Sequence, residues 1–289
     1  MVTSRTAIYG LIGHPLEHSI SPQIHNAAYR SMGLDAVYVC LRVRGDAAKA
    51  VRAARDLGIG GLNVTIPYKS EVLKALDAID DLAKKIGAVN VIRFGDETRG
   101  YNTDVGASIR ALKEVAGNDL SDRSALVLGA GGSARAVAFG LAQEGCAVVV
   151  LNRTASRSAR LARDVSSHIP WARISSGGLN PEELKEAIQR SEIIVNATPA
   201  GMYPNVGESL VDPGMLRPDA IVMDLVYNPP ETKLLRDASK LGCKTVGGLK
   251  MLVYQAADSV EIWTGRKAPI DVMMSAAIEA LGGFAFQQS

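Results

Sequence analysis

The sequence has few aromatic residues, few cysteines and almost no excess of charge. Phe, Trp and Tyr make up 5% of its 289 residues, too few for the stacking platforms of single-strand-binding proteins. A formal net charge of +2 argues against nucleic acid or another polyanion as a partner. The cysteines Cys40, Cys146 and Cys243 lie far apart and form no CxxC motif, which favours a reducing compartment over a disulfide framework or a zinc site.

Long apolar segments are also missing. The run at residues 7–13 stops at His14-Pro15 without a small-residue cleavage pattern, so we expect a strand and not a signal peptide. No stretch approaches the roughly 20 residues that a membrane helix needs. We therefore expect a cytoplasmic protein without membrane contact. The 47% of hydrophobic residues permits a sizeable core, and the length predicts about two domains.

Several catalytic motifs are absent. The chain contains no Gly-Lys dipeptide and no G-x-S-x-G, which excludes a Walker A loop and argues against a hydrolase. His14, His18 and His25 lack a metal-ligand spacing, so we expect polar loop and helix residues and no metal site. Asp77, Asp80 and Asp81 are interpreted as acids at a helix start.

Short β-rich runs alternate with helical ones along the whole chain. The first segment predicts a small α/β sandwich, and Ser21-Pro22 marks a helix start because Ser can cap and Pro suits the first position. From residue 125 the alternation is more regular, which predicts a doubly wound parallel sheet. After Gly247-Gly248 the chain becomes helical again. Both an inserted second domain and two domains in series fit this pattern.

The second segment opens with a glycine-rich turn between a strand and a helix. The residues from Leu126 to Ala134 contain G-x-G-x-x-A, with Gly129 at its first position and Gly131 at its second. The first glycine allows a tight turn, the second allows close approach of a pyrophosphate, and the helix N-terminus supplies amide donors. This arrangement predicts dinucleotide binding.

The tip of the next strand indicates which dinucleotide is bound. An NAD site usually has an acid about 20 residues after the glycines, whereas this chain has Asn152-Arg153-Thr154-Ala155-Ser156-Arg157 and no acid before Asp164. Guanidinium groups and hydroxyls suit a 2′-phosphate. We therefore predict NADP as the cofactor.

Polar residues gather where the strands of the first segment end. They occur in 18–22, in Asn63 to Lys69, in 87–90 and in 101–104. Ligands bind beyond the carboxyl ends of strands in open α/β sheets, so these groups can converge on a small polyhydroxylated acid.

At these motifs the chain resembles the shikimate dehydrogenases almost from end to end. The likeness includes His18-Ser-Ile-Ser-Pro22, Asn63-Val-Thr-Ile-Pro-Tyr-Lys69, Gly87-Ala-Val-Asn90, Asn102-Thr-Asp104, Gly129-Ala-Gly-Gly-Ser133, Asn152-Arg-Thr154, Asn196-Ala-Thr-Pro-Ala-Gly-Met202 and residues 248–255. The resemblance implies NADP-dependent, reversible reduction of 3-dehydroshikimate to shikimate, on the route to chorismate and aromatic amino acids. It also implies a split substrate-binding domain, 1–106 with 248–289, into which a Rossmann-type NADP domain, 107–247, is inserted.

The resemblance also implies roles for individual residues. Lys69 and Asp104 would be the catalytic pair, which is physically sensible because hydride arriving at a carbonyl leaves charge on its oxygen. The implied substrate-binding residues are Ser19, Ser21 and Tyr227 at the carboxylate and Thr65, Asn90, Asp104 and Gln255 at ring hydroxyls, with Asn63 in support and Lys69 at the carbonyl. The implied cofactor-binding residues are Gly129, Ala130, Gly131, Gly132 and Ser133 at the pyrophosphate, Asn152, Arg153, Thr154 and Arg157 at the adenosine phosphate, and Thr198, Leu225, Gly248 and Met251 on the nicotinamide side.

Two residues depart from the family pattern, and alternatives stay open. Val105 follows Asp104 where the family usually has Gly, and Lys250 replaces a common small residue, so turnover or cofactor geometry can differ from the typical member. The alternatives are a quinate or dual quinate/shikimate dehydrogenase and a non-catalytic ligand sensor. A folate-pathway methylene dehydrogenase shares the architecture and a site lysine, but its pterin-pocket motif is not apparent here. A homodimer is compatible with the sequence.

Overall fold

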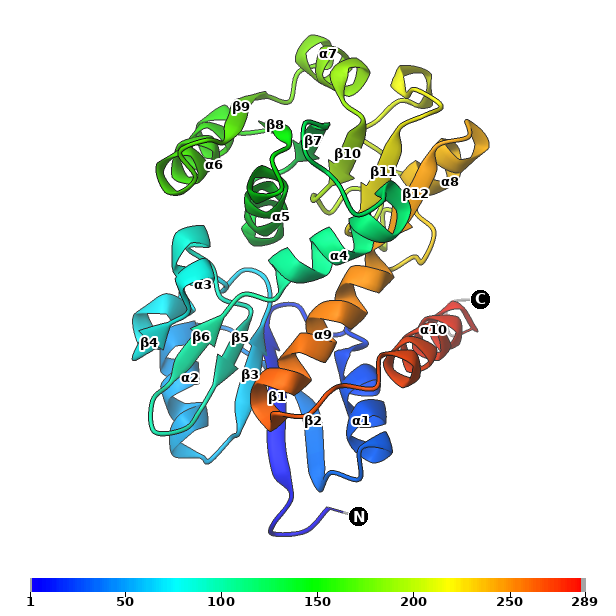
Figure 1. Ribbon diagram of the computed structural model, residues 1–289. Helices are drawn as coiled ribbons and strands as arrows, with labels where there is room; N and C mark the ends of the chain where they lie inside the picture. The colour runs from blue at the N-terminus through cyan, green and yellow to red at the C-terminus, as the bar shows by residue number, and fades with distance from the viewer. Residues whose placement is uncertain (1, 287–289) are drawn as a thin grey trace. The chain divides into compact units, whose positions relative to one another are not determined.

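The computed structural model describes residues 2–286, which form two compact units. Unit 1 comprises residues 1–103 and 253–289, and unit 2 comprises residues 104–252. Unit 2 is therefore an insertion within unit 1, and both are mixed α/β structures (Figure 1). The boundaries between the units lie at the first residue of one helix and inside another.

Unit 1 is built on a six-stranded sheet with the order β2-β1-β3-β5-β6-β4. Its elements are β1 (Ala7–Gly13), α1 (Ser21–Ser31), β2 (Ala36–Arg42), α2 (Ala47–Asp56), β3 (Gly61–Val64), η1 (Val72–Ala75), β4 (Ala78–Ile79), α3 (Asp81–Ile86), β5 (Val91–Arg93), β6 (Arg99–Tyr101), most of α9 (Gly248–Thr264), and α10 (Ile270–Phe286). Strands β1, β2 and β3 are parallel, whereas β5 runs antiparallel to β3 and β6. The parallel strands thus end together, and the loops after β1 and β3 share one edge of the sheet.

Local sequence explains where two of the helices in unit 1 begin. The Asp80 carboxylate accepts a hydrogen bond from the Leu82 amide at 3.4 Å and caps α3, with Asp81 in its first turn. Asp77 does not belong to a helix start, because its carboxylate accepts from the Thr98 amide at 2.8 Å. Ser21 does not cap α1 either; it is the first helical residue, after Ile20, and only the prediction for Pro22 in the first turn is confirmed.

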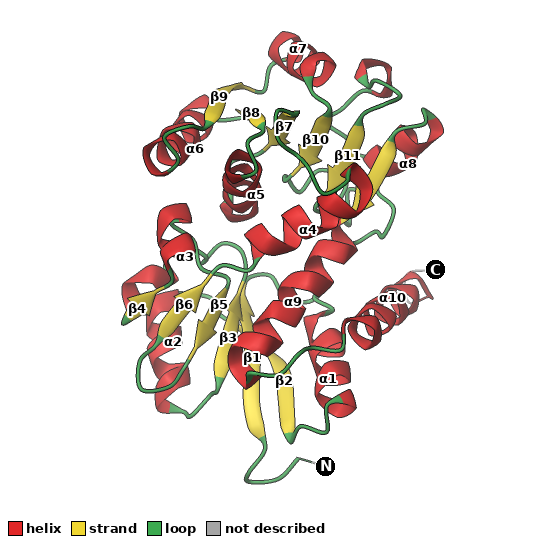
Figure 2. Ribbon diagram, in the orientation of Figure 1, coloured by secondary structure: helices red, strands yellow, loops and turns green. Residues whose placement is uncertain are grey.

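Unit 2 contains a parallel six-stranded sheet with the order β12-β11-β10-β7-β8-β9. Its elements are α4 (Asp104–Ala116), β7 (Ser124–Leu128), α5 (Gly132–Gln143), β8 (Ala147–Asn152), α6 (Ala155–His168), β9 (Arg173–Gly178), α7 (Pro181–Arg190), β10 (Ile193–Asn196), η2 (Pro213–Met215), β11 (Ile221–Asp224), α8 (Lys233–Lys240), β12 (Lys244–Gly247) and the start of α9. Figure 2 shows the helices packed around this sheet. The strand order reverses between β7 and β10, as in dinucleotide-binding folds, and the predicted doubly wound, Rossmann-type arrangement is confirmed.

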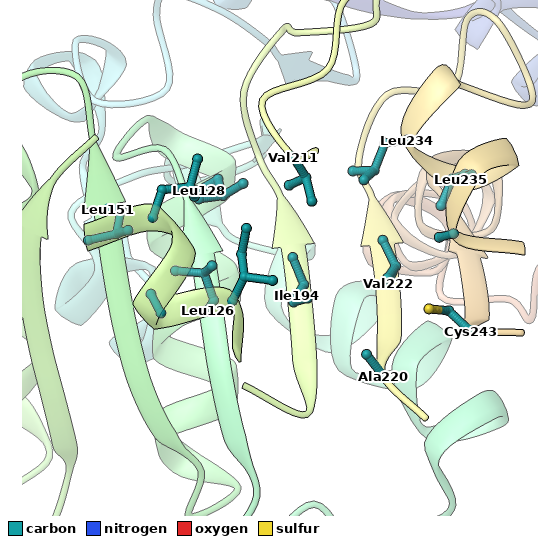
Figure 3. Close-up of a cluster of buried hydrophobic side chains, with 14 residues drawn as sticks. Leu126, Leu128, Leu151, Ile194, Val211, Ala220, Val222, Leu234, Leu235 and Cys243 are labelled. Atoms are coloured by element: carbon teal, nitrogen blue, oxygen red, sulfur yellow. The ribbon is translucent and has the colours of Figure 1, made fainter. Parts of the chain in front are cut away.

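The core of unit 2 forms where α7 and α8 cover the sheet. Leu126, Ile194 and Val222 from three neighbouring strands belong to one buried cluster with Leu234 and Leu235 of α8, and Val222 lies beside these two leucines (Figure 3). Each fully buried side chain of this kind stabilises the fold by roughly 1.5–3 kcal/mol. This packing holds the strand ends, and hence the loops that follow them, in fixed positions.

Among residues 2–286, no helix combines the length and apolar character needed to cross a membrane.

Candidate functional site

The glycine turn after β7 lies at the point where the strand order reverses. Gly129 has a φ of +113°, and a Cβ there would lie 3.0 Å from the carbonyl oxygen of Ala197, which follows β10. Both the backbone conformation and the close approach therefore require glycine at this position. The methyl group of Thr198 lies 3.3 Å from the same point, so the turn and the loop after β10 adjoin.

The next residues place the N-terminus of α5 at this edge of the sheet. Gly131 is the N-cap of α5, and among residues 2–286 no side chain caps the helix. A Cβ at Gly131 would meet no atom of these residues within 4 Å, so internal packing does not require glycine here. Uncapped amide groups with open space before them form an anion-binding site. The residues from Ala130 to Ser133 therefore suit a pyrophosphate.

The tip of β8 is positively charged. Arg153 and Arg157 are exposed, and within residues 2–286 neither forms an ion pair or a side-chain hydrogen bond. Asp164, the first acid after this tip, pairs with Arg135 at 2.9 Å. The Asn152 amide donates to the Thr154 carbonyl at 3.0 Å and shapes the turn into α6. The tip therefore offers two guanidinium groups to an anion.

Three further cofactor candidates belong to the last part of unit 2. The Leu225 amide donates to the Asn196 carbonyl at 2.9 Å, which joins the start of the loop after β11 to the end of β10. A Cβ at Gly248 would lie 2.7 Å from the Val226 carbonyl oxygen, so the start of α9 is pressed against this loop. Met251 is buried one turn later. Thr198, Leu225 and Gly248 thus lie around the carboxyl ends of β10 and β11.

In unit 1 the structure brings three of the substrate candidates together. The Asn63 amide nitrogen donates to the Asn90 carbonyl at 3.2 Å, and the Asn90 side chain donates to Gln255 Oε1 at 3.4 Å. Asn63 also receives a hydrogen bond from the Tyr38 hydroxyl at 2.7 Å and donates to Ser259 at 2.9 Å. Because its amide makes these protein contacts and is buried, Asn63 can position its neighbours.

Sequence reasoning gave no individual role to three members of this network. Thr103 donates from its amide to Asn90 Oδ1 at 2.8 Å, and its hydroxyl donates to the Gln255 carbonyl at 3.1 Å. Ser259, one helical turn after Gln255, and Tyr38 contact Asn63. The four-residue spacing of Ser259 from Gln255 was an available signal, whereas nothing near Tyr38 in the sequence pointed to Asn63.

The remaining substrate candidates lie on loops after the parallel strands of unit 1. Ser19 and Ser21 stand at the entry to α1, where the Ser21 amide donates to the Ser19 hydroxyl at 3.3 Å. Thr65 follows β3, and Lys69 is half-buried four residues later. The Lys69 carbonyl accepts from the Val89 amide at 2.7 Å, which ties its loop to the segment before β5.

Asp104 and Tyr227 are assigned to unit 2. Asp104 is the first residue of α4 and is 4% exposed. Tyr227 is half-buried in the loop after β11.

His25 differs from the expectation of a polar helix residue. It lies fully buried in unit 1 and stacks on Tyr38, with ring centroids 4.0 Å apart. Burial lowers the pKa of His25 to about 3, and within the described residues neither ring nitrogen has a hydrogen-bond partner. His25 is therefore a neutral core residue, which periodicity in α1 alone did not reveal.

Both departures from the family pattern have local explanations. The Lys250 ammonium pairs with Glu114 of α4 at 2.8 Å. Val105 packs against Gly140 of α5, where a Cβ would lie 3.2 Å from the Val105 methyl group. Val105 therefore fits because glycine stands opposite it.

Comparisons with known proteins match this geometry along most of the chain. Residues 11–92 match the shikimate dehydrogenase substrate-binding domain, residues 111–227 the shikimate/quinate 5-dehydrogenase family, and residues 248–278 the shikimate 5′-dehydrogenase C-terminal domain. An NADP(+) shikimate dehydrogenase of Methanopyrus kandleri is 46% identical over 284 residues, which cover 97% of this chain and 98% of that protein.

Solved structures agree with the sequence matches. A shikimate dehydrogenase crystallised with NADP+ is 44% identical, with a TM-score of 0.91 and coverage of 97% of this chain and 98% of that one. The Thermus thermophilus enzyme, in complex with NADP(H) and shikimate, is 34% identical, with a TM-score of 0.84 and coverage of 95% and 100%. On this evidence, the chain belongs to the shikimate dehydrogenase family.

Proposed function

We propose that this protein is an NADP-dependent shikimate dehydrogenase, which reversibly reduces 3-dehydroshikimate to shikimate on the route to chorismate and aromatic amino acids. The observation that carries this conclusion is sequence identity of 43–46% to NADP(+) shikimate dehydrogenases over nearly the whole chain. The guanidinium groups of Arg153 and Arg157, which form no ion pair within residues 2–286, support NADP over NAD, since a 2′-phosphate needs positive charge. The glycine turn and the uncapped α5 suit the pyrophosphate of either dinucleotide.

We propose that unit 1 binds the substrate and unit 2 binds NADP. The polar network of unit 1 presents amide groups of the kind that bind ring hydroxyls, and it includes Asn90 and Gln255. Thr65 would add a further hydroxyl contact. Ser19 and Ser21, with Tyr227 from unit 2, are proposed as ligands of the substrate carboxylate, because hydroxyl groups donate well to an anion.

Lys69 and Asp104 are proposed as the catalytic residues. NADPH supplies the hydride to the carbonyl carbon. Charge then develops on the carbonyl oxygen, where the Lys69 ammonium would stabilise it and donate the proton that completes the new hydroxyl group. Asp104 would accept a hydrogen bond from a neighbouring substrate hydroxyl and so orient the substrate. In the reverse direction the Lys69 amine would take up the hydroxyl proton as the hydride leaves.

A spectrophotometric assay tests the proposal directly. Purified protein is mixed with shikimate and NADP, and the absorbance of the reduced nicotinamide is followed. Parallel reactions with quinate and with NAD separate a shikimate enzyme from a quinate or dual-specificity enzyme. Turnover of shikimate with NADP is the expected result. A protein that binds shikimate without turnover would instead be a ligand sensor.

Two further properties are proposals as well. We infer a cytoplasmic location, because all three cysteines are free thiols and such thiols persist in a reducing compartment. A homodimer stays a prediction, and sedimentation at assay concentrations would test it.

A further inference from the structure

One carboxylate in unit 2 is buried without any assigned role. Asp224 is the last residue of β11 and has no exposed surface. Burial raises the pKa of this carboxyl group, while three hydrogen bonds oppose the rise. Burying a carboxylate costs several kcal/mol unless hydrogen bonds compensate it, so its partners show what it holds.

The first partner is Asn196, which lies opposite Asp224 in the pairing of β10 with β11. The Asn196 amide nitrogen donates to Asp224 Oδ1 at 2.9 Å. An ionised carboxylate only accepts hydrogen bonds, so this contact fixes which end of the Asn196 amide faces outward. The outward Oδ1 accepts from the Thr198 amide at 3.1 Å and from the Thr198 hydroxyl at 2.6 Å.

Thr198 is thereby fixed beside the glycine turn. Its methyl group lies 3.3 Å from the point where a Cβ at Gly129 would stand. Its hydroxyl accepts a hydrogen bond from the Ala200 amide at 3.3 Å. The chain of contacts from Asp224 through Asn196 therefore ends at the crevice where the strand order reverses. In such sheets this crevice holds the dinucleotide.

The second partner is the backbone amide of Val226, which donates to Asp224 Oδ1 at 3.0 Å. This bond fixes the residue directly before Tyr227. The two loops are also joined to each other, because the Tyr203 amide donates to the Asn228 carbonyl at 3.1 Å. The third partner is the Thr232 hydroxyl, which donates to Oδ2 at 2.7 Å. Thr232 is the N-cap of α8.

We propose that Asp224 is a positioning residue for the dehydrogenase reaction, which holds Thr198 for the cofactor through Asn196 and Tyr227 for the substrate through Val226. The inference rests on the proposed function. One carboxylate thus fixes the positions of the loops after β10 and β11. These positions matter because hydride transfer is sensitive to small displacements of the bound groups.

The test compares Asp224→Asn with the wild-type enzyme. The substitution keeps size and shape but replaces one acceptor oxygen with a donor. We expect kcat/KM to fall about tenfold or more, because hydrogen bonds to a charged acceptor are among the stronger ones. We also expect the Kd for NADP, measured by calorimetry, to rise severalfold, a readout that does not require turnover.

Asn180→Ala is the matched control for a general loss of stability. Asn180 caps α7 in the same unit, accepting from the Glu183 amide at 2.9 Å, and is exposed. Removing this cap should lower the Tm while kcat, KM and the Kd for NADP stay within about twofold of wild type. If Asp224→Asn lowers the Tm but leaves kcat/KM and the Kd for NADP unchanged, Asp224 is only structural and the inference is wrong.

A double-mutant cycle tests the proposed route. If Asp224 acts through Thr198, the effects of Asp224→Asn and Thr198→Val on kcat/KM will be clearly less than additive. Additive effects would overturn this route.

A second variant serves if Asp224→Asn does not fold. Asn196→Ala breaks the same link and leaves the carboxylate with Val226 and Thr232. An unchanged Kd for NADP in that variant would overturn the inference. Absence of wild-type turnover would contradict the proposed function instead, since the Kd measurements stand without it.

Discussion

The buried imidazole of His25 makes the stability of the protein depend on pH. Its pKa is lowered to about 3 in the folded protein, against an ordinary value of about 6.5 in the unfolded chain. Between these values the unfolded state binds the extra proton, so its population grows as the pH falls. The stabilising contribution of neutral His25 is therefore present above about pH 6.5 and is lost as the pH falls toward 3.

The size of the effect follows from the linkage relation. Each pH unit below about 6.5 costs about 1.4 kcal/mol of unfolding free energy. At pH 5 the loss from this one residue is about 2 kcal/mol. That is a large share of the 5–15 kcal/mol typical of a folded domain.

His25→Phe removes the titrating group and keeps a ring to stack on Tyr38. We expect its unfolding free energy at pH 7 to stay close to that of wild type, because the buried ring nitrogens have no hydrogen-bond partner among the described residues. Urea unfolding at pH 7 and pH 5 measures the loss in each protein. Wild type should lose about 2 kcal/mol more than the variant over this interval.

Equal losses in wild type and His25→Phe would refute the reasoning, because they would show that His25 does not titrate differently in the two states.

The other predictions concern activity. Lys69→Ala should lower kcat by orders of magnitude with only a modest change in KM, because the ammonium is needed chiefly where charge develops on the oxygen; steady-state kinetics with a near-normal kcat would contradict the catalytic role. Ser21→Ala should mainly raise KM for shikimate, since its hydroxyl would bind the carboxylate in ground and transition states alike; a fall in kcat at unchanged KM would point to another role. Wild type should prefer NADP over NAD by about ten- to a hundredfold in kcat/KM, and Arg153→Asp should reverse much of this preference; a wild-type preference for NAD, measured side by side, would rule out the phosphate contact.

The alternation of strands and helices was predictable where burial is high. Strands such as β7 and β10 are apolar runs in the middle of a sheet, as expected for strands that are buried on both faces. Strand β9 was missed because it lies at the sheet edge and reads Arg-Ile-Ser-Ser-Gly-Gly, with little apolar surface. Helix α7 was missed although Asn180 and Pro181 mark its start, a signal that the sequence did contain.

The residues of the candidate site also differ in how far the sequence could predict them. The glycine turn and the charge at the tip of β8 are local in sequence, so their chemistry could be interpreted from a few residues. The contacts that join Asn63 to Asn90 and Asn90 to Gln255 link residues 27 and 165 positions apart, and only the resemblance grouped them beforehand. Asp224 gave no signal, because an acid at a strand end has many uses and the side chains that bind it lie 28 residues before it and 8 after it.

The discontinuity of unit 1 affects the order in which the chain can fold during synthesis. Trp263 of α9 fills the space beside Gly61 and donates to the Ile92 carbonyl at 2.9 Å, and α10 packs on α1. Residues 1–103 therefore leave the ribosome without the helices that complete their core, whereas every residue of unit 2 has been made once residue 252 is added. Proteins made on ribosomes usually fold their N-terminal domain first. Here the unit that begins second is complete first, and the nascent N-terminal sheet has to avoid aggregation until the last helices of the chain arrive.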